Sequence, residues 1–210
     1  MASEVQRLSQ RKSSLQLVGE AGGIVAPVLA FTCILAAVAS YSAFSWTDNA
    51  LSDLGVISGV TGPVFNFGLY ASGLFVLKFA AFGLFKYLGS WVGKIGALAF
   101  AATSLALMGI GFFPENAAPY HYLFSVAFFV LLPISLLIIT AAFALKRQTK
   151  IALFTLLTAV AAATPWILYF TIHYVPGVAI PEFASALAGS VWTVLLSYKM
   201  LKTPPQPKPT

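Results

Sequence analysis

Residues 122–174 read YLFSVAFFVLLPISLLIITAAFALKRQTKIALFTLLTAVAAATPWILYFTIHY. Two apolar runs, 122–145 and 151–174, are joined by a short connection that holds Lys146, Arg147 and Lys150. Each run is near the ~20 residues that a helix needs to cross ~30 Å of hydrocarbon. The stretch therefore predicts two antiparallel transmembrane helices with a basic connection on one side of the membrane.

The same pattern extends along the chain in both directions. Four more apolar runs of spanning length lie at 24–44, 64–85, 95–113 and 183–201. Basic residues come before the first run, between the second and third, and after the sixth: Arg7, Arg11, Lys12, Lys86, Lys94, Lys199, Lys202 and Lys208. The alternate connections and the run ends beside them hold Asp48, Asp53, Glu115, His121, His173 and Glu182, with no Lys or Arg. By the positive-inside rule, both termini are predicted to be cytoplasmic and the acidic connections to lie outside.

Composition supports this topology. With 59% hydrophobic and 9% charged residues, the chain does not suit a water-soluble globule. The net charge of +6 comes from residues that flank spans and form no stripe with aromatics, which favours anionic lipid over nucleic acid as partner. The single cysteine, Cys33, excludes an intrachain disulfide. We therefore expect an all-α integral membrane protein, a bundle of six transmembrane helices.

The predicted membrane domain covers residues 23–202. Residues 1–22 precede it and have apolar residues at near-helical spacing among basic ones, which predicts an amphipathic helix on the cytoplasmic membrane surface. Residues 203–210 contain four prolines and predict an extended cytoplasmic tail. Lys78 is the one basic residue inside a span, where snorkelling to the headgroups and a functional role are both open. Pro133 and Pro165 are expected to kink their helices, either around a cavity or only for packing.

Polar residues at the outer ends of the spans form the candidate site. Asp53 precedes Leu54-Gly55, where it can bond backbone N–H groups of a turn. Asn66, about one turn inside the second span, needs a polar partner in lipid. His121 shares a helical face with Ser125, as His173 does with Tyr169. Glu182 begins the sixth span, where an acid favours the helix dipole.

These residues allow several functions. In the first, a membrane-embedded hydrolase or transferase acts on lipid headgroups, with Asp53, Glu115 and His121 as catalytic residues. A divalent metal such as zinc, bound by His121 and His173, would neutralise the crowded acids. Headgroup binding without catalysis uses the same site. The alternative is a non-catalytic small transporter or accessory subunit, although the mid-membrane sections carry few polar groups. Haem between the two histidines is a further alternative that the surrounding acids disfavour.

Three motifs resemble a known family. Asn49-Ala-Leu-Ser-Asp-Leu-Gly55, then Phe65-Asn66, then Gly109-Ile-Gly-Phe-Phe-Pro-Glu115 followed by His121 resemble the prokaryotic membrane family called domain of unknown function 998. That family is distantly similar to the Frag1/Sfk1-like group of eukaryotic membrane proteins, some of which act in lipid remodelling or organisation.

The resemblance implies a six-span fold, a lipid-facing role and a bacterial or archaeal plasma membrane, but no assigned activity. Its motif positions correspond here to Asn49, Ser52, Asp53, Asn66, Glu115 and His121, to which His173 and Glu182 are added from topology alone. Among these, the predicted binding residues are Asn49, Ser52, Asn66 and Glu182, and membrane lipids are the predicted partners.

Overall fold

The computed structural model describes residues 12–203 and contains no strand within that range. Its long helices are α2 (Ser14–Ser40), α3 (Thr61–Lys78), α5 (Trp91–Phe112), α6 (Tyr120–Leu145), α7 (Thr149–Ile172) and α8 (Ala179–Lys202). A π-helical segment, η2 (Phe79–Leu84), and the short α4 (Phe85–Leu88) continue α3 to residue 88. In the described part of the chain, six helices are long and apolar enough to cross a membrane, which confirms the predicted all-α six-helix fold.

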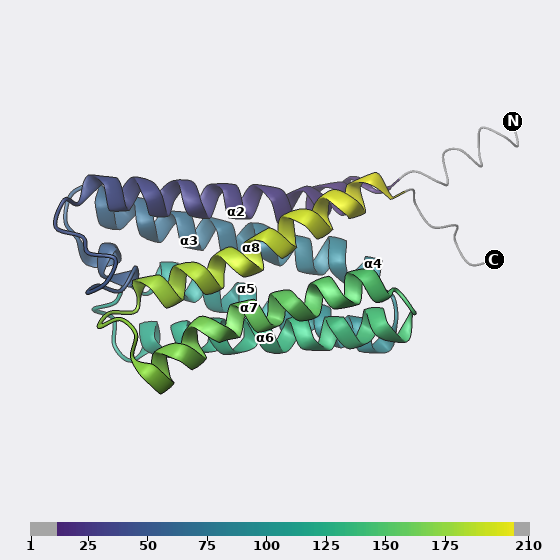
Figure 1. The fold of residues 1–210 in the computed structure, drawn as a ribbon. Helices are drawn as coiled ribbons and strands as arrows, with labels where there is room; N and C mark the ends of the chain where they lie inside the picture. Colours follow the sequence, from purple (N-terminus) through teal and green to yellow (C-terminus); the bar gives the residue numbers. More distant parts are fainter. Residues whose placement is uncertain (1–11, 204–210) are drawn as a thin grey trace, which may run out of the picture.

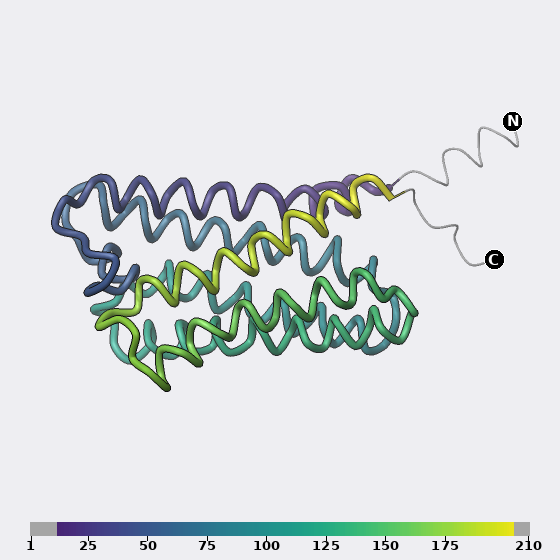
Figure 2. Tube along the Cα trace, in the orientation of Figure 1, coloured from purple at the N-terminus to yellow at the C-terminus, as the bar shows by residue number. Residues whose placement is uncertain are grey.

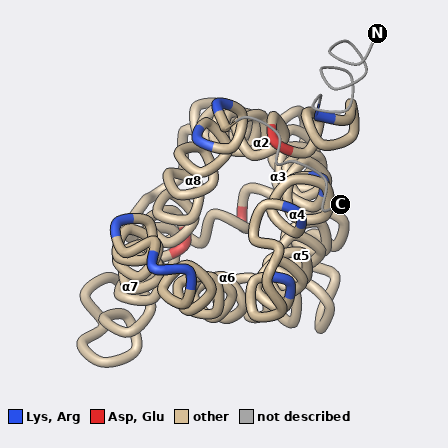
Figure 3. Tube along the Cα trace, turned by 90° about the vertical axis from the view of Figure 1, so that its right-hand side faces the viewer, with Lys and Arg blue, Asp and Glu red and all other residues tan. Residues whose placement is uncertain are grey.

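The six helices form a closed ring in chain order. α2 packs on α3, α3 on α5, and so on to α8, which returns to pack on α2 (Figure 1). The described Lys and Arg residues lie before α2, around the α3–α5 and α6–α7 connections and in the last turn of α8, which are all at one end of the bundle. Figure 3 looks onto this end, with Lys and Arg in blue. We call this end the basic end. The opposite end, where α2–α3, α5–α6 and α7–α8 are connected, is called the acidic end.

Close helix packing depends on small residues, as membrane helices require. A Cβ on Gly68 of α3 would lie 2.2 Å from the Cβ of Cys33 on α2. A Cβ on Gly111 of α5 would lie 2.5 Å from the backbone nitrogen of Tyr70 on α3. On α8, Ser185 donates a 2.7 Å hydrogen bond to the carbonyl of Ala162 on α7. The small residues thus let neighbouring backbones touch, and the bundle has little freedom at these contacts.

The N-terminal segment differs from its prediction. Residues 14–22 are not a separate surface helix but the first turns of α2, whose N-cap Ser13 accepts a hydrogen bond from the Gln16 backbone N–H. The acid Glu20 is buried there and pairs with Lys12 at 2.7 Å. Because these polar groups satisfy each other, the helix can begin ten residues before the apolar run at residue 24. Residues 1–11 and the tail 204–210 lie outside the described residues.

Lys78 lies near the basic end and is half-buried, with its Nζ 5.2 Å from the centre of the Phe75 ring. Pro133 and Pro165 lie inside α6 and α7. The C-terminal part of α7, which contains Pro165, diverges from its neighbours toward the acidic end (Figure 2). A proline ring removes a helical hydrogen bond and bends the helix, which accounts for this divergence.

Candidate functional site: an acidic cavity between α6 and α7

The α2–α3 connection folds back on itself through the short 3-10 helix η1 (Ser52–Val56). Asn49 Nδ2 and the backbone N–H of Ala50 donate to one carboxylate oxygen of Asp53, at 2.8 and 2.9 Å. Asn66 of α3 donates from Nδ2 to the carbonyl of Gly55 at 2.8 Å. A Cβ on Gly55 would lie 2.6 Å from Asn66 Oδ1, so only glycine permits this contact. Asn49 and Asn66 therefore hold the connection in place.

Glu182, in the first turn of α8, ties this connection to the α7–α8 loop. Its Oε2 accepts a 2.6 Å hydrogen bond from the Leu51 backbone N–H, and the residue is only 8% exposed. Two backbone bonds reinforce the attachment, from Gly177 N–H to the Thr47 carbonyl and from Ala179 N–H to the Asn49 carbonyl. A buried carboxyl group is thus fixed at the acidic end by the fold itself.

The α5–α6 connection supplies Glu115, and the first turn of α6 supplies His121. His121 Nδ1 lies 2.7 Å from the carbonyl oxygen of Phe113 and must donate to it, so the proton of the neutral ring sits on Nδ1. Its Nε2 is then an acceptor, and no described residue bonds it although the side chain is only 6% exposed. Glu115 Oε2 is buried and likewise unpaired within residues 12–203.

Burial and the nearby Asp53 carboxylate raise the pKa of Glu115 to about 7. Burial disfavours the ionised form, and a second acid nearby adds repulsion. Ser52 opposes the shift by hydrogen bonding to the carboxylate. The carboxyl group of Glu115 therefore titrates near neutral pH.

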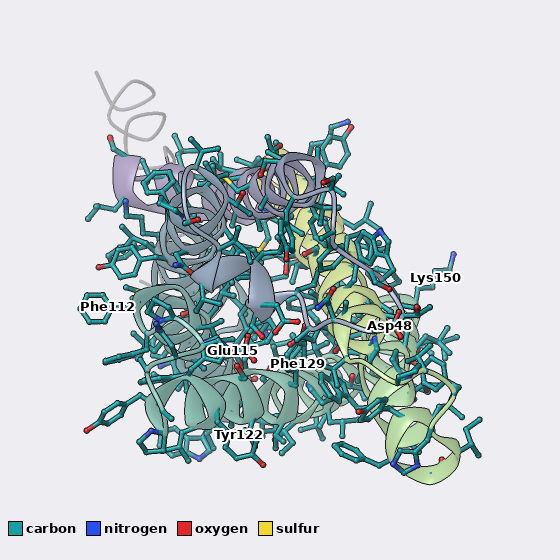
Figure 4. All side chains as sticks on the ribbon, turned by 90° about the vertical axis from the view of Figure 1, so that its left-hand side faces the viewer. Asp48, Phe112, Glu115, Tyr122, Phe129 and Lys150 are labelled. Carbon is teal, nitrogen blue, oxygen red and sulfur yellow. The ribbon has the colours of Figure 1, made fainter. Side chains whose placement is uncertain are left out.

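These side chains line one cavity of about 590 Å³. Its polar part is formed by Ser52, Glu115, His121, Ser125 and Glu182. Its walls are mainly aromatic: Tyr122 and Phe129 from α6 with Trp166, Tyr169 and Phe170 from α7. Figure 4 looks onto the acidic end, with Glu115 and Phe129 toward the interior and Tyr122 at the periphery. The cavity is thus polar at one part and apolar along its walls.

The cavity extends to the outer face of the bundle between α6 and α7. Four of its lining residues are apolar or aromatic and exposed: Tyr122 (70%), Val126 (42%), Val130 (49%) and Phe170 (68%). In a membrane-spanning bundle such a face meets lipid tails, not water. The divergence of the C-terminal part of α7 lies at the same place, so the opening is lateral.

Two smaller cavities continue from this site into the bundle. One of about 90 Å³ shares Ser52, Ser125, Phe129 and Glu182 with the large cavity. The next, of about 50 Å³, lies deeper and includes Ser72, whose hydroxyl has no partner among the described residues. Their linings are mostly apolar, so the strongest polar groups remain at the acidic end.

Not every predicted site residue belongs to the cavity. Ser52, Glu115, His121 and Glu182 line it, and Asp53 lies beside Glu115 behind the lining. His173, by contrast, is an exposed left-handed residue (φ 45°) that ends α7, with its ring 5.7 Å from that of Tyr169. It does not line the cavity, although Tyr169 and Phe170 of the same helix end do. The expected pairing of His121 with His173 is therefore not found.

The expected zinc site has no ligand set in the described range. Within residues 12–203, no group of three or more His, Cys, Asp or Glu side chains is placed to hold a metal ion. The carboxyl groups are instead held by protein donors, such as the Leu51 backbone N–H at Glu182 and Asn49 at Asp53.

The sequence analysis did not identify the aromatic half of the site. Trp166 lines the cavity with a buried Nε1–H that has no partner in the described structure. Trp166, Tyr169 and Phe170 are spaced three and four residues apart, so they share one face of α7. That spacing was the available signal, but it is equally typical of an aromatic belt at a membrane interface.

A family model described as "Protein of unknown function (DUF998)" matches residues 24–199. This range includes the second to fifth membrane-spanning helices in full, most of the first and sixth, and every residue that lines the cavity. No curated protein and no solved structure matches the chain significantly.

Proposed function

The chain belongs to this family of multi-pass membrane proteins, whose description names no activity, and we propose that it binds the headgroup of a membrane lipid in the acidic-end cavity. One observation carries the proposal. A single cavity combines unpaired buried polar atoms on Glu115, His121 and Trp166 with aromatic walls that open between two helices. Buried polar groups without partners are costly, so a polar ligand group would stabilise them.

The lateral opening favours an amphiphile over a water-soluble ligand. A headgroup at Glu115 and His121 would leave its acyl chains to pass Val126 and Val130 into the bilayer. Binding sites commonly join apolar walls to a few polar groups that fix orientation, as here. The cavity volume of about 590 Å³ lies within the range of roughly 300–1,000 Å³ for small-molecule sites.

Binding is favoured over catalysis by the state of His121. A nucleophilic mechanism requires a hydroxyl within hydrogen-bond distance of a base. Ser52 and Ser125 both line the cavity, yet His121 Nε2 has no hydrogen-bond partner within the described residues. A serine nucleophile paired with His121 is therefore not found among the described residues, whereas the binding hypothesis requires no such pair.

To test binding, we propose filling the cavity with Val126→Trp. The indole should occupy the opening and reduce the amount of lipid that stays bound to the purified protein, measured by native mass spectrometry. Val160→Trp is the matched control, because Val160 is a similarly exposed apolar residue of α7 (53%) that does not line the cavity. Equal lipid retention by wild type, Val126→Trp and Val160→Trp would refute the proposal.

The proposal includes an orientation, with the acidic end outside a plasma membrane and both termini in the cytoplasm. The distribution of Lys and Arg supports it. In a Cys33→Ala background, a cysteine at the exposed Ala118 should react with an impermeant thiol reagent in intact cells. A cysteine at the exposed Gln148 should not react. The reverse labelling would place the cavity on the cytoplasmic side.

A further inference from the structure

The charge of the cavity limits which headgroup it can hold. Two acids, Glu115 and Glu182, line the cavity, and Asp53 lies close to Glu115. Of the residues that the structure describes, none that lines the cavity is Lys or Arg. The connections at this end, 41–60, 113–119 and 173–178, contain neither residue type in their sequence. An anionic headgroup would thus meet carboxyl groups with no cation to offset them.

The basic residues cannot compensate from a distance. They gather at the other end of the bundle (Figure 3), where Lys12 pairs with Glu20, the one ion pair among residues 12–203. A hydrocarbon layer ~30 Å thick separates the two ends, so no basic side chain at the basic end reaches the carboxyl groups of the cavity. The carboxyl groups of the cavity are therefore uncompensated by the protein.

The unpaired atoms at the polar part are mainly acceptors. Glu115 Oε2 accepts when ionised, and His121 Nε2 accepts when the ring is neutral, since the Phe113 carbonyl then holds the ring proton on Nδ1. His121 gives an independent indication of a ligand. It lines the cavity and is only 6% exposed, which leaves it more than nine-tenths buried, and its Nε2 has no hydrogen-bond partner among the described residues. A ligand group that satisfies both atoms must donate hydrogen bonds.

The walls add a second preference. Tyr122, Phe129, Trp166, Tyr169 and Phe170 surround the same cavity. Aromatic faces attract cations, and the attraction is strongest when water is excluded. Acceptors, negative charge and aromatic faces all favour the same ligand group, a positively charged amine.

We propose that the cavity selects amphiphiles whose headgroup carries a protonated amine, such as an ethanolamine phospholipid, over anionic amphiphiles. This inference rests on the proposed function. The ammonium group donates to Glu115 and His121 and lies near Glu182, while the acyl chains leave between α6 and α7. Trp166 Nε1–H remains free to donate to an oxygen of the same headgroup.

The test compares two lipids with identical chains on the full-length protein. Delipidated protein in neutral detergent at pH 7.5 is titrated with phosphatidylethanolamine or phosphatidylglycerol, and bound lipid is counted by native mass spectrometry. We expect phosphatidylethanolamine to bind more tightly, on the order of tenfold, from charge and cation–π attraction. Equal binding of the two lipids, or tighter binding of phosphatidylglycerol, would overturn the inference.

Two variants test whether the preference for phosphatidylethanolamine depends on the cavity. Glu115→Gln keeps the shape of the side chain but removes its charge, and should reduce the preference severalfold. Asp48→Asn is the matched control, because Asp48 is an exposed acid at the same end, bonded to Ser45 and Thr47, and does not line the cavity. Equal loss in both variants would assign the preference to the general field of the acidic end and overturn the site.

A final comparison distinguishes failure of the proposed amine selectivity from failure of the proposed lipid-binding function. If neither lipid binds wild type better than Val126→Trp, the lipid-binding function itself fails. If both lipids bind in a manner that Val126→Trp abolishes but without preference, only the amine selectivity fails. Soluble ethanolamine at the same concentration should displace no lipid. Displacement would make a free amine the ligand and overturn the amphiphile part.

Discussion

Glu115, in the α5–α6 connection, lies close to other acidic side chains. It lies beside Asp53 from the α2–α3 connection, and Glu182 of α8 and His121 of α6 line the same cavity. The pKa of about 7 means that the folded protein binds this proton more tightly than the unfolded chain does, whose carboxyl titrates near its ordinary value of 4.5. Its effect on stability therefore depends on pH near neutrality.

The sign of that dependence is fixed by the raised pKa. Glu115 contributes its full stabilisation at pH values below 4.5 and loses it as pH rises through about 7. The wild type in detergent should melt at a lower temperature at pH 8 than at pH 5.5. Glu115→Gln should reduce the pH-dependent change in the free energy of unfolding by about 1 kcal/mol after solvent screening. This corresponds to ~2–4 °C in melting temperature. A thermal melt in which both proteins change equally with pH would contradict the assignment.

The sequence predicted the positions of several site residues but not their partners. Asp53 in a turn, Asn66 with a polar partner and the placement of Glu115 and His121 at the same end of the bundle follow from residue type and topology. The partners do not follow, since Leu51 N–H and Glu182 are far apart in the chain and meet only through folding. The role of Trp166 could not be predicted either, because an indole in a cavity and one facing lipid have the same sequence signature.

At the scale of elements, the six spans were predictable because lipid permits only helices whose backbone groups are satisfied internally. Their ends were less so. α2 begins at Ser14 because Lys12 and Gln16 satisfy the buried Glu20, a set of contacts that hydropathy does not record. Pro165 signalled a bend in α7, yet neither its direction nor the displaced position of His173 could be deduced. The predicted histidine pair does not form because His173 follows the last residue of α7 in an exposed, left-handed conformation.

At the scale of the whole molecule, the closed ring brings one end of each of the six helices together at the acidic end. The alternation of charge along the chain predicted which residues share that end, because antiparallel helices place alternate connections together. It did not predict that the cavity would lie between α6 and α7, since this depends on side-chain packing around the whole ring. The lateral opening is thus a property of the assembled bundle and not of any one helix.

The central claim is that a lipid headgroup occupies the acidic-end cavity, and photocrosslinking tests it most directly. An ethanolamine phospholipid with a diazirine beside its headgroup is added to membranes that contain the wild-type protein, and the adducts are mapped by mass spectrometry after irradiation. The account predicts adducts on lining residues such as Ser52, Glu115 and Tyr122. Adducts spread over the lipid-facing sides of α2, α3 and α5, with none on the cavity lining, would contradict it.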